Sequence, residues 1–207
     1  MGQVAVHDLL HVKDINKIQI NGVIPEWARD MLQRSSYVIV RRGDQNQKIP
    51  VGIRGLKKSQ RLAAWIDYDN FDKIFTPINA VKKFQQNNNH RFELPAFKLL
   101  KKLIPIMKNY KWGVGGSLEY ELATGIHMVH QTSDVDVIMY QPNEISRQDA
   151  KNLIDKLHQI SIVHADIQVV YDDIGFSLEE YAWGKNKEIL VKTNAGPRLV
   201  TDPWKID

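Results

Sequence analysis

Three aspartates in the second half of the chain have a spacing that suits divalent cations. Asp134 and Asp136 are two residues apart, and Asp166 begins a separate apolar run. Residues two apart on a strand point to the same face, so Asp134 and Asp136 can share one site. Adjacent carboxylates repel each other unless cations neutralise them, and Mg²⁺ prefers such oxygen ligands. If the strand that Asp166 begins lies beside the first, three carboxylates can hold two Mg²⁺ for in-line displacement at phosphorus.

The run Gly115-Gly116-Ser117 has the composition of a phosphate-binding turn. Glycines let the backbone approach phosphate oxygens closely, and a helix that begins at Ser117 directs N–H groups at them. The Ser117 hydroxyl can donate to the same oxygens. An isolated Asp-x-Asp is common in surface turns, and a Gly-Gly-Ser turn before a helix is usually only a turn. Their combination, with a third carboxylate on a later strand, is much more specific.

The segments around these residues are predicted to alternate between helix and strand. Apolar spacing and capping residues indicate helices at Ala96–Tyr110 (interrupted by Pro105), Ser117–Thr124, Ser146–Ile160 and from Ser177, and strands at Val135–Tyr140, Ile167–Val170 and Glu188–Thr193. Ser146 followed by Asp149 is an acidic variant of the capping box. Gly125 is expected to end the helix that begins at Ser117.

The N-terminal part is predicted to contain a β-hairpin. Strand-like runs at Ser36–Arg41 and Lys48–Arg54 flank a turn at Gly43–Asn46, while Gln60–Ile66 is compatible with either helix or strand. We therefore expect an α+β protein. Its parts are a small N-terminal substrate-binding module at 1–80, a polar linker at 81–95 and a mixed α/β catalytic domain at 96–207.

Arginines near glycines in the N-terminal module are candidates for phosphate binding. Arg41, Arg54 and Arg61 can form bidentate bonds with phosphate, and Gly52 and Gly55 leave room for a ligand nearby. Solvated strand ends and a tight turn are the structural alternative. If the arginines bind a phosphorylated donor, Arg54→Ala weakens donor binding and changes thermal stability little.

Composition excludes several classes of protein. The 207 residues include no cysteine, which excludes disulfides, thiolate catalysis and cysteine-ligated metals. The longest apolar run has five residues, so no membrane span is predicted, and no secretory signal is visible. We therefore expect a cytoplasmic protein. His127 and His130 are three apart without an obvious third ligand, so no zinc site is predicted there.

The net charge of +4 is unevenly distributed along the chain. Basic residues outnumber acidic ones by 8 to 1 over residues 81–115, whereas acidic residues outnumber basic ones by 15 to 8 over residues 116–207. The basic run comprises Lys98, Lys101, Lys102, Lys108 and Lys111, among others. It can dock an acidic protein by electrostatic steering or be an ordinary solvated helix face. On charge alone, non-specific nucleic-acid binding also remains open.

The order of these motifs resembles the nucleotidyltransferase superfamily, which is built on a DNA-polymerase-beta-like palm. The interval from Ser117 to Asp134 is longer than that superfamily's usual spacing and implies an inserted loop around Thr124–Gln131. Over nearly its whole length, the chain looks like the malonate decarboxylase holo-acyl-carrier-protein synthases. The landmarks are His7–Leu10, Val40–Arg42, Ile49–Gly55 with Gln60-Arg61, Gly116-Ser117, Glu121–Gly125, Ser133–Asp136, Asp166–Val169, Gly196-Pro197 and Asp202–Trp204. Lys57-Lys58 departs from the expected arginine and loses its bidentate geometry.

The resemblance implies a specific reaction and specific partners. Such enzymes transfer the 2′-(5″-phosphoribosyl)-3′-dephospho-CoA group from triphosphoribosyl-dephospho-CoA to a serine of the apo-acyl-carrier-protein subunit, and release diphosphate. Asp134, Asp136 and Asp166 would then bind the metals, and either Asp166 or a metal-bound hydroxide would take the serine proton. Another nucleotidyltransferase remains an alternative, acting in citrate lyase-type transfer or on a small-molecule or RNA acceptor. A non-enzymatic nucleic-acid-binding protein is disfavoured by the intact carboxylate set, so no nucleic-acid partner is expected.

Overall fold

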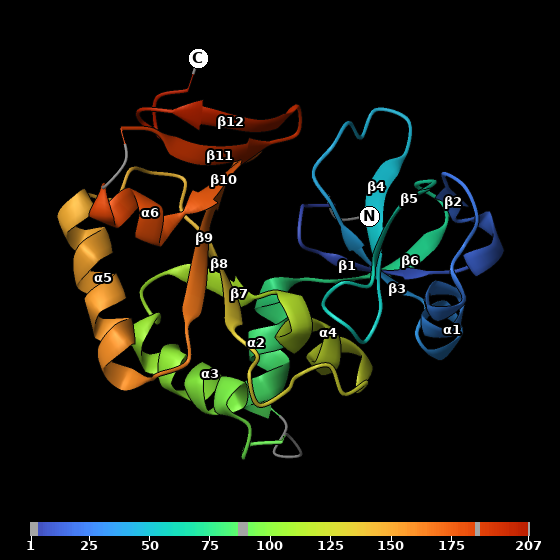
Figure 1. Cartoon of the computed structure of the whole chain (residues 1–207), viewed down its shortest axis with the longest axis horizontal. Helices are drawn as coiled ribbons and strands as arrows, with labels where there is room; N and C mark the ends of the chain where they lie inside the picture. The colour runs from blue at the N-terminus through green and yellow to red at the C-terminus, as the bar shows by residue number, and fades with distance from the viewer. Residues whose placement is uncertain (1–3, 87–90, 185–186, 207) are drawn as a thin grey trace. The chain divides into compact units, whose positions relative to one another are not determined.

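The computed structural model describes residues 4–86, 91–184 and 187–206. These residues form two compact units, Met1–Thr76 and Pro77–Asp207, and in each unit the described strands make one six-stranded sheet (Figure 1). Helices pack against strands in both units. The predicted mixture of α and β structure is therefore confirmed.

Unit 1 is an antiparallel sheet with a helix packed against it. Its elements are β1 (Leu9–Val12), a 3₁₀ turn (Ile15–Lys17), β2 (Gln19–Ile20), α1 (Glu26–Arg34), β3 (Tyr37–Val40), β4 (Ile49–Arg54), β5 (Arg61–Ile66) and β6 (Phe71–Phe75). The strands lie in the order β2-β5-β4-β3-β1-β6. Ile49, Val51 and Ile53 alternate along β4 into the core, where Ala28 and Leu32 of α1 are also buried.

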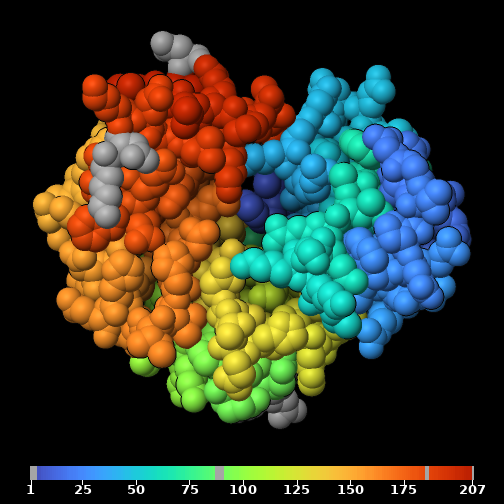
Figure 2. Space-filling view, viewed as in Figure 1, coloured from blue at the N-terminus to red at the C-terminus, as the bar shows by residue number. Residues whose placement is uncertain are grey.

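Unit 2 is a mixed sheet with helices between its strands. Its elements are α2 (Pro77–Gln86), α3 (Pro95–Ile106), β7 (Lys111–Val114), α4 (Gly116–Thr124), β8 (Val135–Tyr140), α5 (Arg147–Ile160), β9 (Ala165–Tyr171), β10 (Ile174–Ser177), α6 (Leu178–Trp183), β11 (Ile189–Thr193) and β12 (Gly196–Val200). The strands lie in the order β12-β11-β10-β9-β8-β7. Only β8 and β9 are parallel among these described strands, and α5 connects them. The chain from α5 to β12 forms a continuous surface, orange to red in Figure 2.

Most of the predicted elements are present, with several corrections. The β3–β4 hairpin is confirmed, and Gln60–Ile66 is resolved as strand β5, because it pairs along the whole of β4. The predicted extension of the helix to Tyr110 is wrong, because α3 ends at Ile106 and the chain then enters β7. In the turn before α4, Gly115 rather than Ser117 is the N-cap, since the helix already begins at Gly116.

The boundary between the units falls at Thr76 and Pro77. Residues 81–86 of the expected linker lie in α2, which belongs to unit 2, and residues 87–90 lie outside the described residues. Throughout the described part of the chain, every helix is too short or too polar to cross a membrane.

Candidate active site

Two of the predicted site aspartates are neighbours across the parallel strands of unit 2. Asp136 on β8 is in register with Asp166 on β9. Residues paired in this way point to the same face of a sheet, and adjacent strands are only about 4.8 Å apart. Asp166 can join the other carboxylates only if its strand lies beside β8, and the structure confirms this arrangement.

Asp134 directly precedes β8 and follows the same alternation as Asp136. Val135 and Val137 are fully buried on the opposite face, whereas Asp134 and Asp136 are each half-buried. The Val135 N–H donates to the His164 carbonyl at 3.0 Å, so the pairing of β8 with β9 begins at the residue after Asp134. Alternation along the strand therefore places Asp134 on the face that carries Asp136 and Asp166.

The turn from β7 into α4 packs its backbone against Asp136. Because β7 is antiparallel to β8, it ends where β8 begins, and the Gly115 N–H donates to the Asp136 carbonyl at 2.9 Å. Gly116 has a φ of +63°, and a Cβ at this residue would lie 1.7 Å from Asp136 Oδ2. Only glycine allows this close approach. The N-terminus of α4, with the buried Ser117 in its first turn, thus begins beside a site carboxylate.

A buried ion pair that the sequence analysis did not identify supports the loop between α4 and β8. Arg91 Nε and Nη2 donate to the two Glu121 carboxylate oxygens at 3.0 and 2.7 Å. Glu121 Oε2 also accepts the N–H groups of Met128 and Val129, both at 2.8 Å. Burial by itself would raise the pKa of Glu121, but the bonds from Arg91 and from the two amides outweigh it and hold this pKa below its usual value. Glu121 therefore fixes the expected inserted loop that leads to Asp134.

The three predicted phosphate-binding arginines share one face of the sheet in unit 1. Arg54 at the end of β4 is in register with Arg61 at the start of β5. Gly52 lies two residues before Arg54, and a Cβ at Gly52 would lie 3.2 Å from the Arg41 Cδ atom. The side chain of Arg41 therefore crosses the same face. Opposed like charges weaken a sheet, so this pairing favours an anionic ligand.

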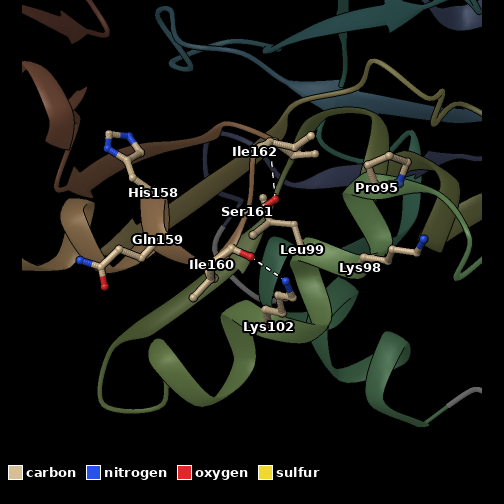
Figure 3. A pocket seen from close by; sticks show the side chains of 10 residues that line it. Pro95, Lys98, Leu99, Lys102, His158, Gln159, Ile160, Ser161 and Ile162 are labelled. Carbon is tan, nitrogen blue, oxygen red and sulfur yellow. Dashed lines mark hydrogen bonds between the residues drawn. The ribbon is translucent and has the colours of Figure 1, made fainter.

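A pocket of about 470 Å³ opens in unit 2 between the start of α3 and the turn from α5 to β9 (Figure 3). Lys98 and Lys102 line one side, and Lys102 Nζ donates to the Ile160 carbonyl at 2.6 Å. Ile162 at its rim is fully exposed. The lining ends at Val163, three residues before Asp166. The pocket therefore combines lysines of α3 with a segment that leads directly into β9, the strand that carries Asp166.

Comparison with known proteins gives one consistent relationship. Models of the N-terminal and C-terminal domains of phosphoribosyl-dephospho-CoA transferase MdcG match residues 5–77 and 83–203. Proteins named phosphoribosyl-dephospho-CoA transferase from Pseudomonas syringae pv. tomato and Klebsiella pneumoniae are 34% and 30% identical to the chain. The alignments cover 97% and 96% of this chain, and 93% and 95% of the relatives. No solved structure matches the chain significantly. The chain belongs to the phosphoribosyl-dephospho-CoA transferase MdcG family.

Proposed function

We propose that this protein transfers a phosphoribosyl-dephospho-CoA group from triphosphoribosyl-dephospho-CoA to a serine of the apo-acyl-carrier-protein subunit of malonate decarboxylase. The serine oxygen forms a bond to the α-phosphorus, the bond to the β-phosphate breaks, and diphosphate leaves with both electrons of that bond. The name of the relatives supports the transferred group. The observation that carries the proposal is the pairing of Asp136 with Asp166 beside the backbone of Gly116.

The carboxylates of Asp134, Asp136 and Asp166 fit a magnesium site. All three are oxygen donors on one face of adjacent strands, and Asp136 Oδ2 occupies the position that a side chain at Gly116 would fill. Mg²⁺, in our proposal two ions, would lower the repulsion between an incoming serine and the triphosphate and stabilise the leaving diphosphate. This is the chemistry of a nucleotidyltransferase with a polymerase-beta-like palm, which we propose as the fold of unit 2.

The remaining residues of unit 2 bind phosphate and accept a proton. N–H groups in the turn at Gly115 and Gly116 and in the first turn of α4 bind the triphosphate, together with the Ser117 hydroxyl. Asp166 accepts the proton of the attacking serine as the new bond forms. In unit 1, the face that carries Arg41, Arg54 and Arg61 binds phosphate groups of the donor.

The acceptor docks, in our proposal, at the lysine-lined pocket. Lys98, Lys101 and Lys102 are exposed on α3, and a carrier protein with an acidic surface complements their charge. The fully exposed Ile162 adds apolar contact area at the same pocket. Because the lining ends three residues before Asp166, a carrier bound there has a short path to the site.

Intact-mass spectrometry of the carrier tests this function. The full-length protein is incubated with the apo-carrier, Mg²⁺ and triphosphoribosyl-dephospho-CoA. We expect the carrier to gain the mass of one phosphoribosyl-dephospho-CoA group, and no gain when EDTA replaces Mg²⁺ or when the acceptor serine is changed to alanine. Parallel reactions use the citrate lyase carrier, and nucleoside triphosphates with other acceptors. Modification only in these parallel reactions would overturn the malonate decarboxylase assignment in favour of another nucleotidyltransferase.

A further inference from the structure

Two histidines and a glutamate of unit 2 form a cluster that includes none of the three aspartates assigned to transfer, although His158 also lines the lysine-lined pocket. His158 lies near the end of α5, His164 directly precedes β9, and Glu179 lies in the first turn of α6. One ligand atom from each lies within 4.8 Å of the others, and this is the group of three possible metal ligands found in the described part of the chain. Figure 1 shows α5 and α6 side by side at the edge of unit 2, where they also pack together.

The two imidazoles approach the same carboxylate from different elements. His164 Nε2 lies 2.9 Å from Glu179 Oε2, whereas His158 Nε2 lies 3.8 Å from Glu179 Oε1. The first distance is a hydrogen bond, but the second is too long for one. His158 therefore lies at ion-pair distance from the glutamate that already bonds His164.

The two nitrogen–oxygen separations are close to those between the ligands of a tetrahedral zinc ion. Zinc binds imidazole nitrogen and carboxylate oxygen at about 2.0–2.2 Å, which places neighbouring ligand atoms roughly 3.4 Å apart. The two distances in this cluster lie on either side of that value. The side chains are about half exposed, so an ion can enter and a water molecule can complete the coordination. Two imidazoles with one carboxylate favour zinc over magnesium.

We propose that His158, His164 and Glu179 form a zinc site. The bound ion would add a link between the end of α5, the start of β9 and α6, beside the hydrogen bond of His164 with Glu179. His164 is two residues before Asp166, so zinc would restrain the end of β9 that carries this aspartate. The proposal concerns this restraint and no reaction at the ion, and it does not depend on the function proposed above.

Calorimetric titration of the metal-free full-length protein with ZnCl₂, in buffer with excess Mg²⁺, tests the site. We expect one zinc ion per chain and a rise in Tm of about 5 °C at a hundredfold excess over Kd. His158→Gln and Glu179→Gln each lower the affinity at least tenfold, because each removes one of three ligands. His127→Ala/His130→Ala is the matched control, since it removes two exposed histidines outside the cluster.

The variants separate this site from the aspartates. Asp136→Asn is expected to bind zinc as the unaltered protein does, because Asp136 is not a member of the cluster. The far-ultraviolet circular dichroism of each variant shows whether it is folded. Unchanged zinc affinity in folded His158→Gln and Glu179→Gln, no zinc binding by the unaltered protein, or loss of binding in Asp136→Asn would overturn the proposal.

Discussion

Each of the two sheets pairs two residues of like charge: two aspartates in the sheet of unit 2, and two arginines in the sheet of unit 1. In unit 2, Asp136 faces Asp166 across parallel strands, and in unit 1, Arg54 faces Arg61 across antiparallel strands. Directly opposed like charges destabilise a sheet. Each pairing of like charges lowers stability by itself, and we propose that bound ions of the opposite sign act at both.

The two pairings differ in how they are built. Arg54 and Arg61 are seven residues apart in one hairpin, and Arg61 is exposed with a long side chain that can adapt to a ligand. Asp136 and Asp166 are thirty residues apart, joined through α5, and the backbone of Gly116 packs against the Asp136 carboxylate. In our proposal, unit 1 therefore provides an adaptable binding surface and unit 2 a rigid catalytic constellation.

The largest expected effect comes from neutralising a carboxylate of unit 2. Asp136→Asn should reduce transfer by about 10³-fold or more, because it removes a charge that the proposed magnesium site requires. The Tm should be unchanged or slightly higher, since the repulsion with Asp166 is relieved. Mass spectrometry of the carrier and thermal unfolding measure the two effects. Asp134→Asn should behave in the same way.

Asp155→Asn on the exposed face of α5 is the control for these carboxylate variants, and it should retain full activity. Near-normal transfer by either site variant would show that the aspartates of unit 2 are not catalytic. The contrast between the two sheets would then lose its functional meaning.

Gly116→Ala tests the rigidity of the site in unit 2. The new Cβ would lie 1.7 Å from Asp136 Oδ2, so the carboxylate must move, and we expect a loss of about 10²-fold in transfer rate. Gly125→Ala is a matched control. Gly125 also has a positive φ, of +77°, but no atom lies within 4 Å of the added methyl group. It should lose stability through backbone strain and keep its transfer rate. Equal rates in the two variants would argue against a role for the close approach at Gly116.

Arg54→Ala tests the adaptable surface of unit 1. We expect the Kd for triphosphoribosyl-dephospho-CoA to rise about tenfold, because one charge-assisted contact with phosphate is lost. The Tm should change little, since the variant also removes the repulsion with Arg61. Arg29→Ala, an exposed arginine on α1, is the control. Calorimetric titration with the donor measures the affinity, and unchanged affinity in Arg54→Ala would remove unit 1 from donor binding.

Asp8 gives the smallest expected effect on transfer and a distinct effect on stability. Burial raises its pKa to about 6, despite the hydrogen bond that it accepts from the Ala5 N–H. Because this pKa lies above the unfolded value near 3.8, the stabilisation is complete below about pH 4 and is lost as the pH rises through 6. Between pH 5 and pH 8 the free energy of unfolding should fall by about 1.4 kcal/mol from this group.

Urea unfolding across this pH range, with Asp8→Asn and the exposed Asp30→Asn, checks the assignment. In Asp8→Asn, but not in Asp30→Asn, the fall in the free energy of unfolding between pH 5 and pH 8 should be smaller by about 1.4 kcal/mol. If Asp8→Asn and the unaltered protein showed the same pH dependence of stability, the raised pKa of Asp8 would be contradicted. The buried carboxyl of Asp8 thus favours its neutral form.

Local sequence was enough to predict the elements whose signals are short-range. Ser146 and Ser177 cap α5 and α6 by accepting the N–H groups of Asp149 and Glu180, as their positions before the helices indicate. The predicted strand Val135–Tyr140 is observed with the same ends, because its largely apolar run between Asp134 and Gln141 is already visible in the residue types. Gly125 ends α4 in the left-handed conformation, as expected. In each case the deciding interactions lie within a few residues.

By itself, the sequence determined which residue types are available: the aspartates, the glycines before α4 and the arginines of the β4–β5 hairpin. Only the tertiary structure decided which of them meet. The pairing of Asp136 with Asp166 depends on the register of two strands joined through α5, and the ion pair of Arg91 with Glu121 joins residues thirty apart. The convergence of His158 and His164 on Glu179 likewise requires three elements to pack. Such contacts depend on packing between distant segments, and no pattern of neighbouring residues encodes that packing.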